Sequence, residues 1–165
     1  FVIEKYFSSY LDILYQYDGD INETAGDGLM VIFQGSSDKN AINSAKAALG
    51  IRKRTESINI ELKGRFQPVS IHMGMNSGAA SVGTSRFQGR AGARTTFTAT
   101  GPLTNLAARL AAASEPGQIL VGPETARRIN GLFRLEKLGP MTFKNIKNAV
   151  EVYNLSGSLN TSSQE

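Results

Sequence analysis

Residues 95–110, TTFTATGPLTNLAARL, join two kinds of secondary structure in a fixed order. The segment begins with β-branched and aromatic residues, which favour an extended strand. Gly101 and Pro102 then end the strand, and proline is tolerated in the first turn of a helix because its missing N–H group would have no partner there. Alanine and leucine dominate the residues that follow and favour a helix. The segment therefore predicts a chain that mixes strands with helices.

The predicted helix has two different faces. At 100° per residue, Leu103, Leu106 and Leu110 fall on one apolar stripe. Asn105 and Arg109 lie four residues apart on the opposite side, among small alanines. A solvated face usually carries lysine and glutamate, so this face favours the approach of a ligand or partner. The alternative is a polar surface face along which Arg109 extends its alkyl chain.

The composition is that of one globular domain. The chain has 165 residues, 41% hydrophobic and 19% charged, which is enough to bury a sizeable core. It lacks an apolar run long enough to span a bilayer, and we expect no membrane contact by this domain. It contains no cysteine, which excludes disulfides and thiolate zinc sites. We expect a cytoplasmic protein, either free or tethered through other domains of a longer chain.

The net charge of +4 suits a polyanionic ligand, either a nucleoside triphosphate or a nucleic acid. Much of the excess comes from arginines at positions 86, 90, 94, 127, 128 and 134. Single-strand binders interleave arginine with aromatic side chains, and this chain does not, so we expect no nucleic acid partner. The glycines at positions 83, 89 and 92 are not followed by Gly-Lys-Ser/Thr, which excludes a P-loop NTPase.

Apolar periodicity predicts the elements of the N-terminal half. In chain order, they are a helix over residues 1–17, a hairpin of strands 21–24 and 29–33, a helix over residues 41–61 and a half-buried strand over residues 69–76. No capping residue precedes the first helix, which suggests that the natural beginning of the domain lies upstream. We interpret His72, on the polar side of its strand, as structural because the sequence offers it no catalytic partner.

The C-terminal half continues the alternation of strands and helices. Its predicted elements are a strand from residue 78 to 83, a glycine- and arginine-rich loop over residues 84–94, a strand from residue 95, the helix from residue 102, a strand at 119–121, a short helix opened by Pro123, and closing strands at 133–138 and 150–155. Residues 156–165 are polar and aperiodic, which predicts a flexible tail. We therefore expect one domain over residues 1–155.

Four segments of the chain resemble the catalytic domain of class III nucleotidyl cyclases, the adenylate and guanylate cyclases, of the bacterial type. They are INETAGDGLMVIF, FTATGPLTNLAARL, EPGQILVGPETA and LGPMTFKNIKNAVEVYNL. Several spaced motifs in the right order are far more specific than any single one, and these cover nearly the whole chain. The order of elements and the resemblance both indicate an α+β fold, a ferredoxin-like antiparallel-rich sheet flanked by helices.

By this resemblance, the polar face of the helix lies in an active site. Asn105 would position the ribose, and Arg109 would stabilise charge that develops on the α-phosphate. Lys144 matches the triphosphate-binding lysine of the family, with Lys147 as the alternative. An isolated lysine near a strand end is otherwise usually only solvated.

The resemblance assigns base recognition to Glu23 and Thr98. Adenylate cyclases usually have lysine at the first position, whereas guanylate cyclases have a glutamate that accepts hydrogen bonds from the N1–H and amine of guanine. Bacterial adenylate cyclases often have threonine or aspartate at the second position. The two residues indicate different bases, so the choice between ATP and GTP stays open. Without a ligand role, Glu23 is an exposed strand residue.

Asp27 is the metal-binding candidate. In the family this aspartate helps to hold two Mg²⁺ or Mn²⁺ ions, which activate the ribose 3′-hydroxyl and neutralise the leaving pyrophosphate. The second carboxylate of that two-metal site would come from the family's first strand, which is not in this chain, so we expect an N-terminally incomplete catalytic domain. The alternative for Asp27 is that it only forms the hairpin turn with its two neighbouring glycines.

The resemblance implies a cyclase that forms a 3′,5′-cyclic nucleotide and pyrophosphate from a purine nucleoside triphosphate for intracellular signalling. Because the family takes its metal carboxylates from one subunit and its Asn/Arg pair from the other, a head-to-tail homodimer is implied. The alternative is a catalytically silent cyclase-like module that dimerises and relays signals within a larger protein. A ferredoxin-like RNA binder would need exposed aromatic residues on two adjacent strands, and the sequence does not indicate them.

Overall fold

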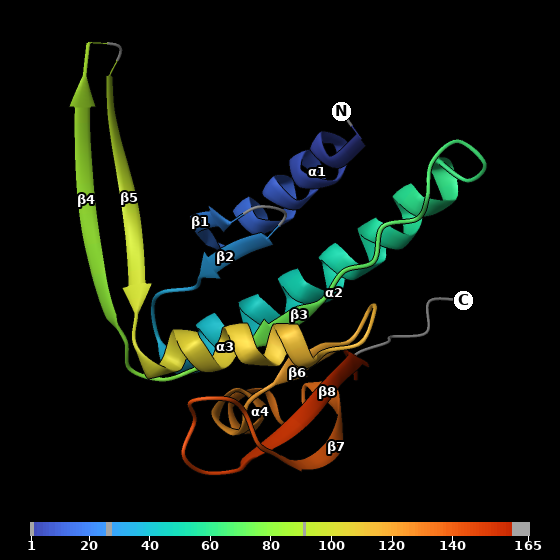
Figure 1. The fold of residues 1–165 in the computed structure, drawn as a ribbon, viewed down its shortest axis with the longest axis vertical. Helices are drawn as coiled ribbons and strands as arrows, with labels where there is room; N and C mark the ends of the chain where they lie inside the picture. Colours follow the sequence, from blue (N-terminus) through green and yellow to red (C-terminus); the bar gives the residue numbers. More distant parts are fainter. Residues whose placement is uncertain (1, 26–27, 91, 160–165) are drawn as a thin grey trace.

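The computed structural model describes residues 2–25, 28–90 and 92–159, in which helices and strands alternate along the chain (Figure 1). The helices are α1 (Val2–Gln16), α2 (Ser37–Glu61), α3 (Pro102–Ala113) and α4 (Pro123–Ile129). The strands are β1 (Asp20–Ala25), β2 (Gly28–Ile32), β3 (Met73–Met75), β4 (Ser81–Gly89), β5 (Gly92–Thr100), β6 (Ile119–Val121), β7 (Phe133–Met141) and β8 (Val150–Ser158). This mixture confirms the predicted α+β class.

The centre of the fold is a four-stranded sheet in the order β3-β6-β8-β7. β3 and β6 are parallel, and β8 is antiparallel to both β6 and β7. All three residues of β6, Ile119, Leu120 and Val121, are 0% exposed. A strand that is buried on both faces requires cover on both sides of its sheet.

The side chains of β6 alternate between two hydrophobic cores. Ile119 and Val121 pack in one cluster with residues of α2 and with Ile129 of α4. Leu120 packs on the opposite face of the sheet with Leu110 of α3. The sheet therefore lies between α3 on one face and α2 with α4 on the other.

Helix α1 packs along α2 through a stripe of buried tyrosines. The hydroxyl of Tyr6 donates a hydrogen bond of 2.6 Å to Oδ1 of Asn59. The hydroxyls of Tyr10 and Thr55 are hydrogen-bonded at 2.5 Å, and burial raises the pKa of Tyr10. Each phenol thus has a polar partner inside an otherwise apolar contact, which avoids the cost of a buried unsatisfied group.

Two hairpins, β1–β2 and β4–β5, form separate two-stranded sheets. Figure 1 shows β4–β5 projecting away from the helices and from the four-stranded sheet. At its base, β5 contacts β1. In the described part of the chain, the antiparallel-rich sheet predicted as one unit is therefore divided into three parts.

The prediction of a loop over residues 84–94 is wrong, because most of these residues belong to the β4–β5 hairpin. The two strands pair without interruption from Ser81 opposite Thr100 to Gly89 opposite Gly92. Glycine and arginine are weak indicators of a strand when read alone, since pairing across the ladder decides the conformation. Gly92 has a φ of +135°, which a glycine adopts at little cost beside the chain reversal.

Two strands have different ends from those predicted. β3 is shorter than residues 69–76, because the backbone N–H and C=O of Val69 bond to the side chain of Asn59, at 2.9 and 3.0 Å, instead of to a strand. β8 continues past residue 155 to Ser158, and Gly157 is paired with Arg134 of β7. The last strand therefore continues three residues beyond the end predicted from the sequence.

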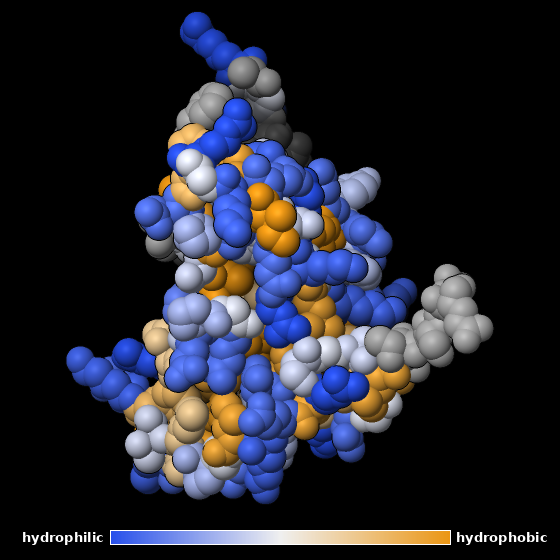
Figure 2. All heavy atoms as spheres, turned by 90° about the vertical axis from the view of Figure 1, so that its right-hand side faces the viewer, coloured by the Kyte–Doolittle hydropathy of each residue, from blue (hydrophilic) through white to orange (hydrophobic). Residues whose placement is uncertain are grey.

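Among the described residues, no helix is both long and apolar enough to cross a bilayer. Apolar side chains lie among polar ones on the face shown in Figure 2. Exposed apolar residues include Ile3 of α1 and Ile60 of α2, at 55% and 74%. Single exposed apolar residues of this kind are normal for a globular protein.

Candidate active site

Helix α3 carries two of the candidate residues, and its start is fixed by the Gly-Pro pair. Gly101 has a φ of +111°, in the region that favours glycine, and Pro102 occupies the first turn. The carbonyl of Gly101 accepts a hydrogen bond of 3.1 Å from the N–H of Asn105. The chain therefore turns directly from β5 into α3, as the sequence predicts.

The two faces of α3 differ in the way that their residues predict. Leu110 is 0% exposed and packs on the four-stranded sheet together with Leu106. Asn105 is exposed and Arg109 is half-buried. No carboxylate in the described part of the chain forms an ion pair with Arg109. No ion pair among the described residues therefore occupies the donors of this guanidinium, which can bind an anion.

Lys144 lies in the connection between β7 and β8, where it is exposed. The preceding residue, Phe143, packs in the same cluster as Leu106 of α3. Figure 1 shows this connection and the start of α3 on the same side of the molecule. Asn145 has a φ of +65°, so the chain turns immediately after Lys144. Lys144 and the alternative, Lys147, are both exposed in this connection.

The two base-recognition candidates lie on strands that contact each other. Glu23 is on β1, opposite Met30 and beside an irregularity in the β1–β2 ladder. Thr98 is on β5, opposite Gly83 of β4. Because β1 contacts β5, the backbones that carry Glu23 and Thr98 belong to neighbouring elements. The structure describes the backbone at both positions and not the side chains.

Asp27, the predicted metal ligand, lies outside the described residues. Among the residues that the structure does describe, no group of three or more His, Cys, Asp or Glu side chains could hold a metal ion. A pair of divalent ions needs several oxygen ligands. The described side chains do not make up a two-metal site.

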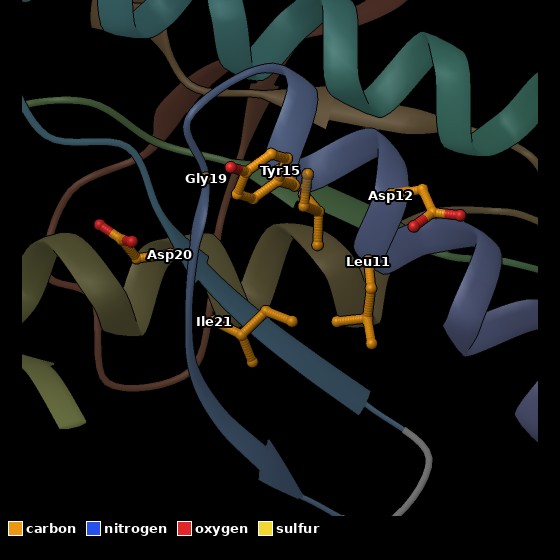
Figure 3. A pocket seen from close by; sticks show the side chains of 7 residues that line it. Leu11, Asp12, Tyr15, Gly19, Asp20 and Ile21 are labelled. Carbon is orange, nitrogen blue, oxygen red and sulfur yellow. The ribbon is translucent and has the colours of Figure 1, made fainter. Parts of the chain in front are cut away.

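A surface pocket of 390 Å³ lies between α1 and the start of β1 (Figure 3). Leu11 of α1 and Ile21 of β1 lie on either side of it. Asp12 and Asp20 also line it, and its lining contains no basic residue. Because two carboxylates would repel a triphosphate, we exclude this pocket as the nucleotide site.

The arginines of α4 are engaged within their own helix. Arg127 and Arg128 both bind Glu124, at 2.6 and 3.0 Å. Two hydrogen bonds, the larger effect coming from Arg127 and the smaller from Arg128, lower the pKa of Glu124 to about 2. These arginines contribute to the basic balance of the sequence, but their guanidinium groups already have a carboxylate partner.

Two residues that contact the candidate catalytic helix were not predicted from the sequence, Gly74 of β3 and Asn76 directly after this strand. A signal for them was present, because His72, Gly74 and Asn76 alternate along one side of the strand. A glycine inside a strand often marks the close approach of another backbone.

Comparison with known proteins agrees with this arrangement. A family model described as the adenylate and guanylate cyclase catalytic domain matches residues 2–157. No curated protein sequence matches the chain. Solved structures that share its fold include two guanylyl cyclases and an adenylyl cyclase.

The adenylyl cyclase CyaB from P. aeruginosa is 28% identical, with a TM-score of 0.85 over 96% of this chain and 82% of that one. The guanylyl cyclase Cya2 is 22% identical, with a TM-score of 0.85 over 99% and 83% of the two chains. The guanylate cyclase domain of RhGC from Catenaria anguillulae, solved in complex with GTP, is 22% identical, with a TM-score of 0.78 over 95% and 82%. Since the family model spans nearly all of the described residues and the fold is shared with both kinds of cyclase, the chain belongs to the adenylate and guanylate cyclase catalytic domain family.

Proposed function

We propose that this domain converts a purine nucleoside triphosphate to a 3′,5′-cyclic nucleotide and pyrophosphate, with Asn105 and Arg109 as its catalytic residues. The observation that carries the proposal is the solvent-facing side of α3, where the amide and the guanidinium lie one turn apart and Arg109 has no ion-pair partner in the described part of the chain. In cyclisation, the ribose 3′-oxygen loses its proton and bonds to the α-phosphorus, and the bond from that phosphorus to the β-phosphate oxygen breaks.

Each residue has a separate part in this reaction. Asn105 binds the ribose and orients its 3′-oxygen towards the α-phosphorus, which removes most of the entropic cost of alignment. Arg109 donates to the α-phosphate oxygens and stabilises the charge that develops there. Lys144 binds the β- and γ-phosphates, which leave as pyrophosphate. The support for this role is that Phe143, the residue before Lys144, packs against the same buried cluster as Leu106 of α3.

We propose Mg²⁺ or Mn²⁺ as the cofactor, with Asp27 as one ligand. The family generally uses divalent metal ions. Such ions acidify the 3′-hydroxyl and neutralise the pyrophosphate. Glu23 and Thr98 contact the purine base; the support is that β1 contacts β5, the strand that leads directly into α3.

We also propose that the domain acts as a head-to-tail homodimer in the cytoplasm. The open polar face of α3 supports a shared site, since residues that complete it would approach from outside the chain. The projecting β4–β5 hairpin supports a dimer as well, because an isolated two-stranded ladder is marginally stable and gains from a partner's surface.

The decisive experiment is product analysis by mass after the complete protein is incubated with ATP or GTP and Mn²⁺. We expect a cyclic nucleotide from at least one of the two. Arg109→Ala should lower kcat by ~10²-fold with little change in KM, because a donor that acts in the transition state is lost. Arg54→Ala, on the exposed side of α2, is the matched control and should keep kcat.

Two results would contradict this proposal. If neither nucleotide is cyclised, the silent relay module becomes the better description of the protein. If Arg109→Ala raises KM and leaves kcat unchanged, Arg109 contributes to ground-state binding only.

A further inference from the structure

One side of β3 and its continuation holds α3 at three places along its length. His72, Gly74 and Asn76 are two residues apart, so these three positions face the same side of the extended chain. The intervening Met73 and Met75 pack on the opposite side, against the core formed with α2 and α4. We call His72, Gly74 and Asn76 the β3 seat.

The middle of α3 crosses β3 so closely that the space between the two backbones has no room for a side chain at position 74. A Cβ atom added to Gly74 would overlap the backbone oxygen of Ala107 and the backbone nitrogen of Ala111, and would lie 2.8 Å from Cβ of Leu110. These backbone atoms cannot move unless the whole helix moves. The distance between the sheet and α3 is therefore set by the absence of a side chain at position 74.

Asn76 holds the beginning of α3. Its Nδ2 donates a hydrogen bond of 3.1 Å to the carbonyl of Leu103, in the first turn of the helix. Its Oδ1 lies 2.6 Å from where a Cβ of Gly122 would stand, so Gly122 leaves the space that the amide needs. The carbonyl held by Asn76 belongs to a residue only two positions before Asn105.

His72 holds the other end. Its Nδ1 lies 2.7 Å from the backbone oxygen of Ser114, the residue that ends α3. A carbonyl only accepts, so Nδ1 carries the hydrogen in this contact. The helix is thus fixed at its first turn, at its middle and at the residue that caps its C-terminal end.

We propose that the β3 seat positions Asn105 and Arg109 for catalysis, and that Asn76 is the positioning residue with the most direct effect. This inference rests on the proposed function of α3. A helix transmits displacement along its axis, so a first turn released from Asn76 moves both donors together. Transition-state donors are effective only within a fraction of an ångström of the reacting atoms. None of the three residues needs to touch the substrate.

The test compares two asparagines that make the same kind of bond. Asn59, like Asn76, is half-buried and donates from Nδ2 to a backbone carbonyl, that of Val69, at 3.0 Å, but its hydrogen-bond partners, Tyr6 and Val69, lie outside α3. In the complete protein, Asn76→Asp should lower kcat by ~10-fold to 10²-fold with KM nearly unchanged. Asn59→Asp should lower the thermal stability to a similar extent and keep kcat.

Two further measurements separate positioning from a general loss of stability. Added to Arg109→Ala, Asn76→Asp should cause much less further loss of kcat than it does alone, because the donor that it misplaces is already absent. Amide exchange in the first half of α3 should become faster in Asn76→Asp and stay unchanged in Asn59→Asp. If Asn76→Asp does not fold, His72→Ala, whose side chain is exposed, is measured in the same way.

Equal losses of kcat in the two asparagine variants, or fully additive losses with Arg109→Ala, would overturn the inference. Unchanged exchange in α3 would overturn it as well. A different outcome is that Arg109→Ala itself leaves kcat unchanged while Asn76→Asp still speeds amide exchange in α3. That result would contradict the proposed catalytic role of Arg109, and the β3 seat would then support the helix without a role in catalysis.

Discussion

The four-stranded sheet with its helices and the two hairpins are built in opposite ways. The sheet is covered by α3 on one face and by α2 and α4 on the other, and β6 is completely buried. The hairpins β1–β2 and β4–β5 have two strands each and are not joined to that sheet by a ladder in the described part of the chain. One region therefore supplies its own stability, and the other depends on neighbouring surfaces.

This difference divides the candidate site. Asn105, Arg109 and Lys144 lie on or beside the covered sheet, whereas Glu23 and Thr98 lie on the hairpins. Residues that stabilise a transition state need a rigid support, and the sheet provides one. The hairpins carry the residues proposed to select the base, so partner contacts that order the hairpins would also complete base recognition.

Hydrogen exchange should show the largest contrast between the two regions. Amides of β6 open only with the whole domain, whereas those of β4 and β5 open locally, so we expect β6 to be protected at least ~10³-fold more. Measurement at rising protein concentration should increase protection in β4 and β5, because the proposed dimer covers them. Equal protection of both regions in dilute protein would show that the hairpin is as stable as the sheet.

A matched pair of valines measures the same contrast in stability. Val121 of β6 is 0% exposed and Val82 of β4 is 40% exposed. Val121→Ala should lower the free energy of unfolding by ~2–3 kcal/mol, since it removes buried methyl groups and leaves a cavity. Val82→Ala should cost less than ~1 kcal/mol. Urea unfolding of both variants measures these free energies. A larger loss of stability in Val82→Ala than in Val121→Ala would contradict the comparison.

Glu23→Lys tests whether the hairpin region selects the base. A lysine donates to adenine N1, whereas the glutamate accepts from guanine, so the ratio of ATP to GTP turnover should rise by about 10-fold. Glu56→Lys changes the net charge equally on the exposed surface of α2 and should leave the ratio unchanged. An equal shift in both variants would assign the effect to net charge instead of recognition.

The smallest effect is expected from the ion pairs of α4, which lie at the surface. The arginine partners hold the pKa of Glu124 at about 2 in the folded chain, below its ordinary 4.5. Its contribution to stability is therefore complete above pH 4.5 and is lost as the pH falls towards 2. Glu124→Gln should lower the melting temperature slightly at pH 7 and make no difference near pH 2. A larger effect at pH 2 than at pH 7 would contradict this sign.

Local patterns predicted the helices well. The spacing of Tyr6, Tyr10 and Leu14 predicted α1, and these residues are its buried stripe. Gly101 and Pro102 predicted the start of α3, and the apolar face of that helix is the one that packs on the sheet. Helical periodicity can be read from residues three and four apart, so no distant partner is needed to recognise it.

Strand pairing was predicted less well. The glycine- and arginine-rich residues of β4 and β5 suggested a loop, but they pair along their full length. The strand predicted over residues 69–76 is shortened by the side chain of Asn59, which lies on α2. In both cases the conformation depends on hydrogen bonds to another segment, β5 for β4 and α2 for Val69. The local pattern of residues does not show these bonds.

The sequence by itself determined the order of the elements, the two faces of α3 and the family resemblance, because each is written in residues close together along the chain. Only the tertiary structure decided that the sheet is divided, that Phe143 packs against the same buried cluster as Leu106 of α3, and that Gly74 and Asn76 hold this helix. The physical reason is that pairing, close approach and helix position arise from contacts between segments far apart in the chain. Such contacts leave no period in the sequence, and at Gly74 the decisive feature is a side chain that is absent.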